Sequence, residues 1–338
     1  MSKFHLIRNL LAAAILLGSA GANAADKLAP LHANPAKISI SGLSSGGYMA
    51  VQYDVAFSGS TLGVGVVAGG PYNCAFVNLG GIATCLTGSP LGYESYLAII
   101  GFAALGEIDP VRNLAKGKVY LFSGTDDTVV HQSVMDAVRD FYTLASVPAA
   151  NMVYVNNFAA GHAFVSPEFG NPCDKTEPPY INECAVAAGE LYDQPAALLT
   201  QIYGPLQPKA TTLSAQPKPF SQAEFAPAAA GLASTGYVYI PDSCQQASGR
   251  NCAVHVVFHG CKQGAGTVGD DVYAKVGYNA WADTNGIIVL YPQVDPTTFP
   301  LNPEGCWDWW GYTGLNFQTR SGPQLAAIRS MVKRLTVK

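Results

Sequence analysis

The residues most capable of chemistry surround Ser44, which lies at the centre of a G-x-S-x-G motif formed with Gly42 and Gly46. A strand-like run, Ile38–Ser41, precedes the motif, and a segment long enough for a helix, Gly46–Ala56, follows it. A serine on such a strand-to-helix turn is typical of a nucleophile elbow, in which bulky flanking residues would clash. Backbone N–H groups at the start of the helix point toward developing negative charge. The motif therefore predicts that Ser44 is a nucleophile.

A nucleophilic serine needs a base and an acid that orients the base, in the chain order Ser, Asp, His for this type of turn. The strand-like run Lys118–Phe122 leads into a loop that contains Asp126 and Asp127. The G-x-x-D-x-x-V pattern and the separation of 83 residues from Ser44 favour Asp127 as the acid. The alternative is that either aspartate only caps the following helix.

His162 is the candidate general base, because it follows the strand-like run Met152–Val155 on a loop, 35 residues after Asp127. A single histidine is more often structural. The other histidines lie in the N-terminal leader, before the first strand, close behind the acid, within a strand, or in the loop described next: His5, His32, His131, His255 and His259.

A second stabiliser of negative charge is expected from a loop that follows another strand. Val254–Phe258 is strand-like and leads into His259-Gly260-Cys261, an H-G pattern typical of an oxyanion loop. In the usual order this strand comes before the nucleophile, whereas here it comes after. Joining Lys338 back to Asn34 would restore that order, so the sequence predicts a circular permutation.

The chain contains eight cysteines, an even number that fits an oxidising compartment. Eight cysteines allow 105 pairings, and sequence alone does not choose among them. Short separations suggest three disulfides and leave one long-range pair: Cys74 with Cys85, Cys173 with Cys184, Cys244 with Cys252, and Cys261 with Cys306. A metal site is the alternative, but there is no C-x-x-C pair and no histidine at ligand spacing.

A disulfide between Cys261 and Cys306 would fix the oxyanion loop, or would only stabilise the fold. Cys306 is followed by a run that holds three of the four tryptophans, beginning with Trp307 and interrupted by Asp308 and Gly311. Aromatic residues usually belong to the core. The interruptions favour a loop, on which we predict that Trp307 lines an apolar crevice.

The elements that must position these residues alternate along the chain. Short β-branched runs separated by helix-length segments predict an α/β fold with a mostly parallel central sheet flanked by helices. Further strands are expected at 62–67, 237–240 and 287–291, and further helices at 133–145, 271–283 and 324–335. We expect one catalytic domain, 25–338, with a Pro- and Ala-rich surface excursion or lid at about 167–233.

The composition excludes several classes of protein. Charged residues make up 12% of the chain and hydrophobic residues 49%, with 35 glycines and 22 prolines, which excludes disorder, coiled coil and collagen. The net charge is −4, and it becomes −6 without Lys3 and Arg8. We therefore expect no nucleic-acid binding.

Residues 1–24 have a positive start, an apolar run from Leu10 to Leu17 and a small-residue ending, Ala22-Asn23-Ala24. This pattern predicts a signal peptide cleaved after Ala24 and a secreted, extracellular or periplasmic, protein. A membrane anchor is the alternative, but the apolar run is too short for one. No later segment of the chain is long and apolar enough to span a membrane, so no membrane span is expected in the mature chain.

With these residues in place, the chain resembles the polyhydroxyalkanoate depolymerases, most closely the single-domain, circularly permuted poly(3-hydroxybutyrate) depolymerases of the α/β-hydrolase superfamily. The resemblance covers nearly the whole mature chain. The motifs that carry it surround Ser44 (ISGLSSGGYMA), Asp127 (SGTDDTVV), His162 (GHAF), Cys261 (VVFHGCKQ) and Trp307 (GCWDWWGY).

The resemblance implies a triad of Ser44, Asp127 and His162, with the backbone N–H groups of Ser45 and Cys261 as oxyanion donors and a tryptophan beside the crevice. It implies a secreted serine esterase that cleaves short-chain poly(3-hydroxyalkanoate), with a polyester polymer or oligomer as partner. We expect a monomer and no cofactor or metal. Two other functions stay open: a carbohydrate esterase that removes feruloyl or acetyl groups, and an inactive polymer-binding protein.

Overall fold

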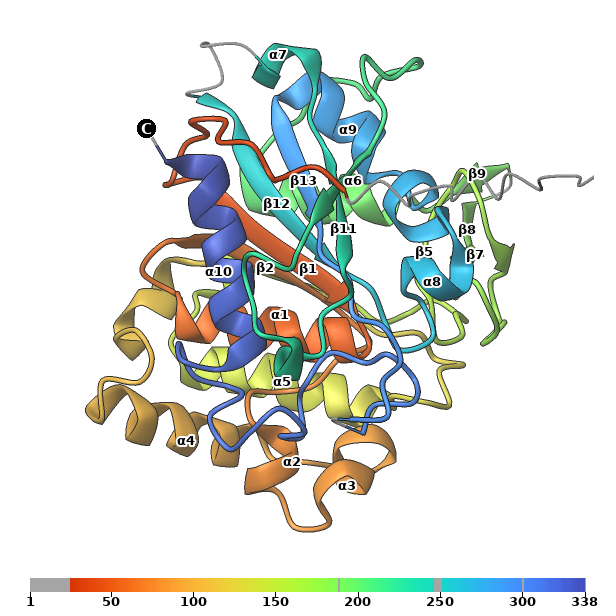
Figure 1. Ribbon diagram of the computed structural model, residues 1–338. Coiled ribbons are helices and arrows are strands. Elements are labelled where there is room, and N and C mark those ends of the chain that lie inside the picture. Colours follow the sequence, from red (N-terminus) through yellow and green to blue (C-terminus); the bar gives the residue numbers. More distant parts are fainter. Residues whose placement is uncertain (1–24, 188, 246–250, 300, 338) are drawn as a thin grey trace, which may run out of the picture.

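The computed structural model describes residues 25–187, 189–245, 251–299 and 301–337, so the expected signal peptide lies outside the described residues. Its main sheet has eight strands in the order β10-β11-β13-β12-β1-β2-β3-β4 (Figure 1). β1 pairs in parallel with β12 and β2, and the parallel pairing continues to β13 on one side and to β3 and β4 on the other. β11 is antiparallel to both of its neighbours, β10 and β13. The fold is therefore α/β, with a mostly parallel central sheet.

The strands of this sheet are β1 (Ile38–Leu43), β2 (Thr61–Val67), β3 (Lys118–Phe122), β4 (Met152–Val155), β10 (Lys218–Ser221), β11 (Thr235–Tyr239), β12 (Ala253–Phe258) and β13 (Ile287–Tyr291). The longer helices are α1 (Ser45–Ala56), α4 (Gly92–Ala104), α5 (Gln132–Leu144), α6 (Gln194–Tyr203), α9 (Tyr278–Asn285) and α10 (Pro323–Thr336). Short helices are α2 (Cys74–Val77), α3 (Gly81–Thr87), α7 (Asp242–Gln245) and α8 (Ala265–Val268).

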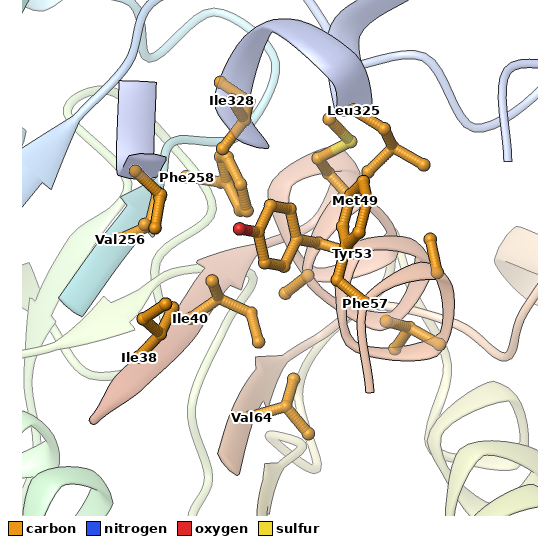
Figure 2. Packing of buried hydrophobic residues seen from close by; sticks show 14 of the residues in the cluster. Ile38, Ile40, Met49, Tyr53, Phe57, Val64, Val256, Phe258, Leu325 and Ile328 are labelled. Carbon is orange, nitrogen blue, oxygen red and sulfur yellow. The ribbon is translucent and has the colours of Figure 1, made fainter. Parts of the chain in front are cut away.

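Helices cover both faces of the sheet, as the apolar strands require. α1, α4, α5 and α10 lie on one side, where Met49 and Tyr53 of α1 pack against Leu325 and Ile328 of α10 (Figures 1 and 2). α6 and α9 contribute to a second buried cluster, which includes Leu198. Because side chains alternate along a strand, β1 sends its isoleucines to the first cluster and its serines to the other face.

The strands and helices expected from the sequence are present within a few residues of their expected bounds, with one exception. The helix expected at 271–283 is divided into a short π-helical turn, Asp271–Lys275, and α9. Gly277, with a φ of 109°, lies between them. A residue in that left-handed conformation interrupts helical geometry, so the expected single helix was wrong.

The segment at about 167–233 contains more regular structure than a surface excursion. It holds small strands, α6 and the edge strand β10. α6 contacts β2 and β3 and buries Leu198 and Leu199 completely. The segment thus supplies part of the layer that covers the sheet. Its small strands are β6 (Asn171–Pro172), β7 (Ile181–Glu183), β8 (Ala185–Ala187) and β9 (Glu190–Leu191). β5 (Phe164–Val165) precedes the segment and pairs with β7.

Four disulfides join the cysteines in the pairs that their separations suggested: Cys74–Cys85, Cys173–Cys184, Cys244–Cys252 and Cys261–Cys306. The two ends of the described chain lie side by side, because the backbone N–H groups of Leu31 and Ala33 both donate to the carbonyl oxygen of Leu335. Within the described residues, none of the helices has the length and apolarity that crossing a membrane requires.

Candidate active site

Ser44 occupies a strained turn between β1 and α1. Its φ is 58°, a left-handed value that is uncommon outside glycine, and its backbone N–H donates to the carbonyl oxygen of Val67. A side chain at Gly42 would collide with the carbonyl oxygen of Gly46. A Cβ at Gly46 would come within 2.5 Å of the carbonyl oxygens of Phe258 and His259. Both glycines are therefore required by space, as the motif predicted.

His162 and Asp127 form a buried pair. His162 Nδ1 lies 2.7 Å from Asp127 Oδ2, and the side chains are 7% and 0% exposed. The other carboxylate oxygen of Asp127 accepts the N–H groups of Val129 and Val130, at 2.8 and 2.9 Å. Because one oxygen is fixed by the backbone, the carboxylate presents the other to the imidazole. Nε2 is then the ring nitrogen left for a reacting group.

The loop that carries His162 is braced by the segment that follows it. The N–H of His162 donates to Thr176 Oγ1, and the N–H of Gly161 donates to the carbonyl oxygen of Cys173. Cys173 is linked in turn to Cys184 next to β7. The imidazole is therefore held at its backbone as well as at Nδ1.

The loop after β12 lies against Ser44. A Cβ built on Gly260 would be 3.4 Å from Ser44 Cβ. Within the described chain, the N–H of Cys261 has no hydrogen-bond acceptor, so this donor is available. Ser45 is the first residue of α1, where backbone N–H groups have no partner inside the helix.

One cavity of about 370 Å³ is lined by Ser44, by His162 and by the loop after β12. The residues that line it include Ser45, Gly260 and Cys261, and most of the exposed lining is apolar. Its apolar wall consists of Leu43, Tyr48, Ile82, Leu86, Val129, Trp309 and Trp310. The arrangement can hold an uncharged, mainly apolar acyl compound with its carbonyl group near Ser44.

Trp307, for which we predicted a place on the crevice wall, is instead fully buried, with its ring against Phe258 and His259. The chain turns after it because the Asp308 carboxylate accepts the N–H groups of residues 310–313. Trp309 and Trp310 line the cavity in its place.

Tyr48 was not predicted as a site residue. It lies four residues after Ser44 on α1, one helical turn along, and stacks on Trp309 with ring centroids 4.2 Å apart. Its spacing of one helical turn from Ser44 was the signal in the sequence that could have identified it. Burial raises the pKa of its hydroxyl, so the group stays protonated.

A second serine–histidine cluster lies inside the sheet. His255 of β12 contacts Ser39 Oγ through Nδ1, at 2.6 Å, and Ser41 Oγ through Nε2, at 2.9 Å. All three residues are fully buried, none lines the cavity, and burial lowers the pKa of His255 to about 3. Both ring nitrogens of His255 are hydrogen-bonded and the ring is buried outside the cavity, so this cluster has a structural role.

No group of histidine, cysteine, aspartate or glutamate side chains within the described ranges could hold a metal ion.

A scan against protein-family models gave no match. The chain is 42% identical over 341 residues to a poly(3-hydroxybutyrate) depolymerase from Delftia acidovorans, covering 98% of this chain and 67% of the relative. It is 38% identical over 337 residues to a polyhydroxybutyrate depolymerase from Talaromyces funiculosus, covering 95% of each. The chain belongs to the polyhydroxybutyrate (PHB) depolymerases. It is therefore a serine carboxylic ester hydrolase.

Solved structures of PHB depolymerases have the same fold. The crystal structure of the enzyme from Penicillium funiculosum matches with a TM-score of 0.83 and 36% identity, over 92% of this chain and 98% of that one. A serine-to-alanine variant of a PHB depolymerase, complexed with an R3HB trimer, matches with the same TM-score and coverage at 35% identity.

Proposed function

We propose that this PHB depolymerase cleaves its polyester with Ser44 as nucleophile, His162 as general base and Asp127 as the acid that orients the imidazole. The single observation that carries this assignment is the buried Asp127–His162 pair, in the same cavity as a serine on a strained elbow. Asp127 accepts from Nδ1–H and so leaves Nε2 unprotonated and able to take the serine proton.

In the first half-reaction, Ser44 Oγ attacks the ester carbonyl carbon while His162 takes its proton. The tetrahedral oxyanion accepts hydrogen bonds from the N–H groups of Ser45 and Cys261. His162 then protonates the alcohol end of the polymer as it leaves. In the second half-reaction, His162 activates a water that hydrolyses the acyl-enzyme and regenerates Ser44. No cofactor takes part in these steps.

The apolar wall favours the methyl and methylene groups of a short-chain 3-hydroxyalkanoate. Trp309 and Trp310 offer flat surfaces for an uncharged chain that carries no strong hydrogen-bond donors. The trimer bound in the matching structure is an oligomer of this chemistry. Ile82 extends this apolar lining toward solvent, since it is 42% exposed, and the ion pair of Lys262 and Glu304 also lines the cavity. These features support a polyester chain as substrate.

We further propose a secreted protein with a single catalytic domain and a permuted chain order. Four disulfides fit an oxidising compartment. Strands from both halves of the chain share one sheet. If the chain is followed from β10 to β13 and then from β1 to β4, the strand of the oxyanion loop comes before the strand of the nucleophile. The hydrogen bonds from Leu31 and Ala33 to Leu335 place the ends close enough for such a rearrangement.

The decisive test is Ser44→Ala, compared with Ser41→Ala in the preceding strand β1. We expect Ser44→Ala to lower kcat on amorphous poly(3-hydroxybutyrate) by on the order of 10⁶-fold, as in comparable triad enzymes, with an unchanged circular dichroism spectrum. Ser41→Ala removes a hydrogen bond to the buried His255 and should keep most of the activity. Undiminished hydrolysis by Ser44→Ala would contradict the assignment, and faster turnover of a feruloyl ester than of the polyester would favour a carbohydrate esterase.

A further inference from the structure

Gln263 bridges two loops that both contribute residues to the cavity lining, Gly260 on one and Tyr180 on the other. The side chain is 1% exposed. Its Oε1 accepts the N–H of Gly260 at 2.7 Å, on the oxyanion loop. Its Nε2 donates to the carbonyl oxygens of Pro179 and Tyr180, at 2.8 and 3.1 Å. All three contacts are to backbone, so the glutamine acts as a cross-link between two segments that are more than 80 residues apart in the chain.

The segment held by Nε2 belongs to the brace of the general base. The carbonyl oxygen of Tyr180 also accepts the N–H of Phe164 at 3.0 Å. Phe164 is the first residue of β5 and lies two residues after His162. β5 pairs with β7, whose first residue directly follows Tyr180. The amide of Gln263 is therefore connected, through one shared carbonyl group, to the backbone that carries His162.

The contact at Oε1 fixes the peptide group that directly precedes the one carrying a proposed oxyanion donor. Because the Gly260 N–H is occupied by Gln263, the next free N–H in the loop is that of Cys261. The peptide group between Gly260 and Cys261 is fixed on its other side, where His259 Nδ1 donates to the Gly260 carbonyl oxygen at 2.7 Å. In a trans peptide the C=O and N–H point in opposite directions. The Cys261 N–H accordingly points away from His259.

We propose that Gln263 is a positioning residue for ester hydrolysis, which holds the Cys261 N–H and the His162 loop in register beside the cavity. This proposal rests on the proposed triad and oxyanion donors. Gln263 does not contact the reacting atoms. It acts because an oxyanion donor must lie within a few tenths of an ångström of the position that the oxyanion takes, and pre-organised donors have their effect only in that geometry.

A purely stabilising role is the competing explanation, and the chain contains a matched control for it. Gln222 is also 1% exposed and makes the same set of contacts away from the cavity. Its Oε1 accepts the N–H of Gln293, and its Nε2 donates to the carbonyl oxygens of Ala233 and Gln293, at 2.8 and 2.9 Å. Replacing either glutamine with methionine removes three hydrogen bonds from a similar buried volume.

The experiment compares Gln263→Met with Gln222→Met, using p-nitrophenyl butyrate as a soluble ester. Both variants should have lower melting temperatures than the parent. For Gln263→Met we expect kcat to fall about 10- to 100-fold with KM within twofold of the parent, because the lost interaction acts in the transition state. Affinity for a trifluoromethyl ketone that forms a tetrahedral adduct should fall by the same factor as kcat/KM. Gln222→Met should keep the kcat of the parent.

Gln263→Glu provides a second variant if the methionine variant does not fold. It keeps an acceptor for the Gly260 N–H but turns a carboxylate oxygen toward the 179–180 carbonyl groups, so its kcat should fall at least as far as that of Gln263→Met. A folded Gln263 variant with kcat within twofold of the parent would overturn the proposal, as would an equal fall in kcat for Gln222→Met. Ser44→Ala is assayed in parallel, and activity in that variant would refute the proposed triad. An inactive Ser44→Ala beside a Gln263→Met variant with kcat within twofold of the parent would refute only the positioning role.

Discussion

Asp127 divides its two oxygens between backbone and imidazole, and this division determines what an amide in its place would do. The N–H groups of Val129 and Val130 require an acceptor at Oδ1. In Asp127→Asn the amide oxygen would meet that need, and the amide NH₂ would face His162 Nδ1. Nδ1 would then have to accept, which moves the proton to Nε2, the atom that receives the Ser44 proton in the proposed mechanism.

We therefore expect Asp127→Asn to lower kcat by about 10⁴-fold while the fold persists, the loss seen when a triad histidine is held in the wrong tautomer. Steady-state kinetics on p-nitrophenyl butyrate measure the loss, and circular dichroism tests the fold. Asp126→Asn is the matched control, because this neighbouring carboxylate makes no contact with the imidazole and should cost little activity. A fall of less than tenfold in Asp127→Asn would contradict the proposed orienting role.

At the scale of single residues, the sequence was informative where backbone geometry demands a residue type. Gly42 and Gly46 are required by space around Ser44, so their spacing predicts the elbow. The choice among tryptophans was not accessible in this way. Trp307 and Trp309 differ in exposure to the cavity because of a turn held by Asp308, and a run of aromatic residues does not show which ring faces inward.

At the scale of elements, the disulfides at the two ends of β12 differ in what they constrain. Cys244–Cys252 lies before the strand, and Cys261–Cys306 lies after it, on the loop beside Ser44. The chain separations are 8 and 45 residues. In the loop-entropy model their removal destabilises the protein by about 2.5 and about 4 kcal/mol respectively. Stability alone would thus distinguish them only modestly.

Activity should distinguish them clearly. We expect the double variant Cys261→Ser, Cys306→Ser to lower kcat about tenfold or more at a temperature where it is folded, because the proposed oxyanion loop loses its link to the aromatic loop. Cys244→Ser, Cys252→Ser should keep the kcat of the parent and lose only melting temperature. Kinetics on p-nitrophenyl butyrate, with melting curves beside them, provide the measurement. Equal kcat values in the two double variants would show that the second bridge only stabilises the fold.

The elements that could be predicted are those whose own residues determine them. β3 and β13 have the expected bounds because buried strands are short apolar runs between breakers. The edge strand β4 is only partly buried, but it is also a short apolar run and has the expected bounds. α6 was missed since its segment is rich in proline and alanine, and its burial depends on the sheet it covers. β10 was missed for the same reason, because this edge strand is defined by its pairing with β11 and not by a pattern in its own residues.

At the scale of the whole molecule, the order of the strands follows from which loops must meet. Ser44, Asp127 and His162 come after β1, β3 and β4, all parallel, so their loops gather at one edge of the sheet. The sequence predicts this meeting because the carboxyl ends of parallel strands share an edge. It does not predict Gln263 as a bridge, since that role depends on a loop more than 80 residues away.

Three buried groups make the stability of the whole molecule depend on pH. Burial lowers the pKa of His255 to about 3 and that of His259 to about 4, from 6.5. As the pH falls below 6.5 the unfolded chain takes up these protons first, so stability is lost on acidification. Burial raises the pKa of Asp54 from 3.8 to about 7, although a hydrogen bond from Tyr142 opposes the shift. Its contribution has the opposite sign, present below about pH 4 and lost as the pH rises through 7.

For these three groups, acidification between about pH 4 and 6.5 loses two histidine contributions and gains one from Asp54, and burial also raises the pKa of Asp308, which acts in the same direction as Asp54. Each proton corresponds to roughly 1.4 kcal/mol per pH unit. Asp54→Asn removes the opposing contribution while its amide oxygen still accepts from Tyr142, so the free energy of unfolding should rise with pH more steeply than in the parent, by about 1.4 kcal/mol per unit. Urea denaturation at several pH values measures both slopes. Asp140→Asn, which removes a carboxylate from an exposed position, is the control. If the plots of unfolding free energy against pH are parallel for the parent and Asp54→Asn, the buried carboxyl group of Asp54 titrates at its ordinary pKa, contrary to this prediction.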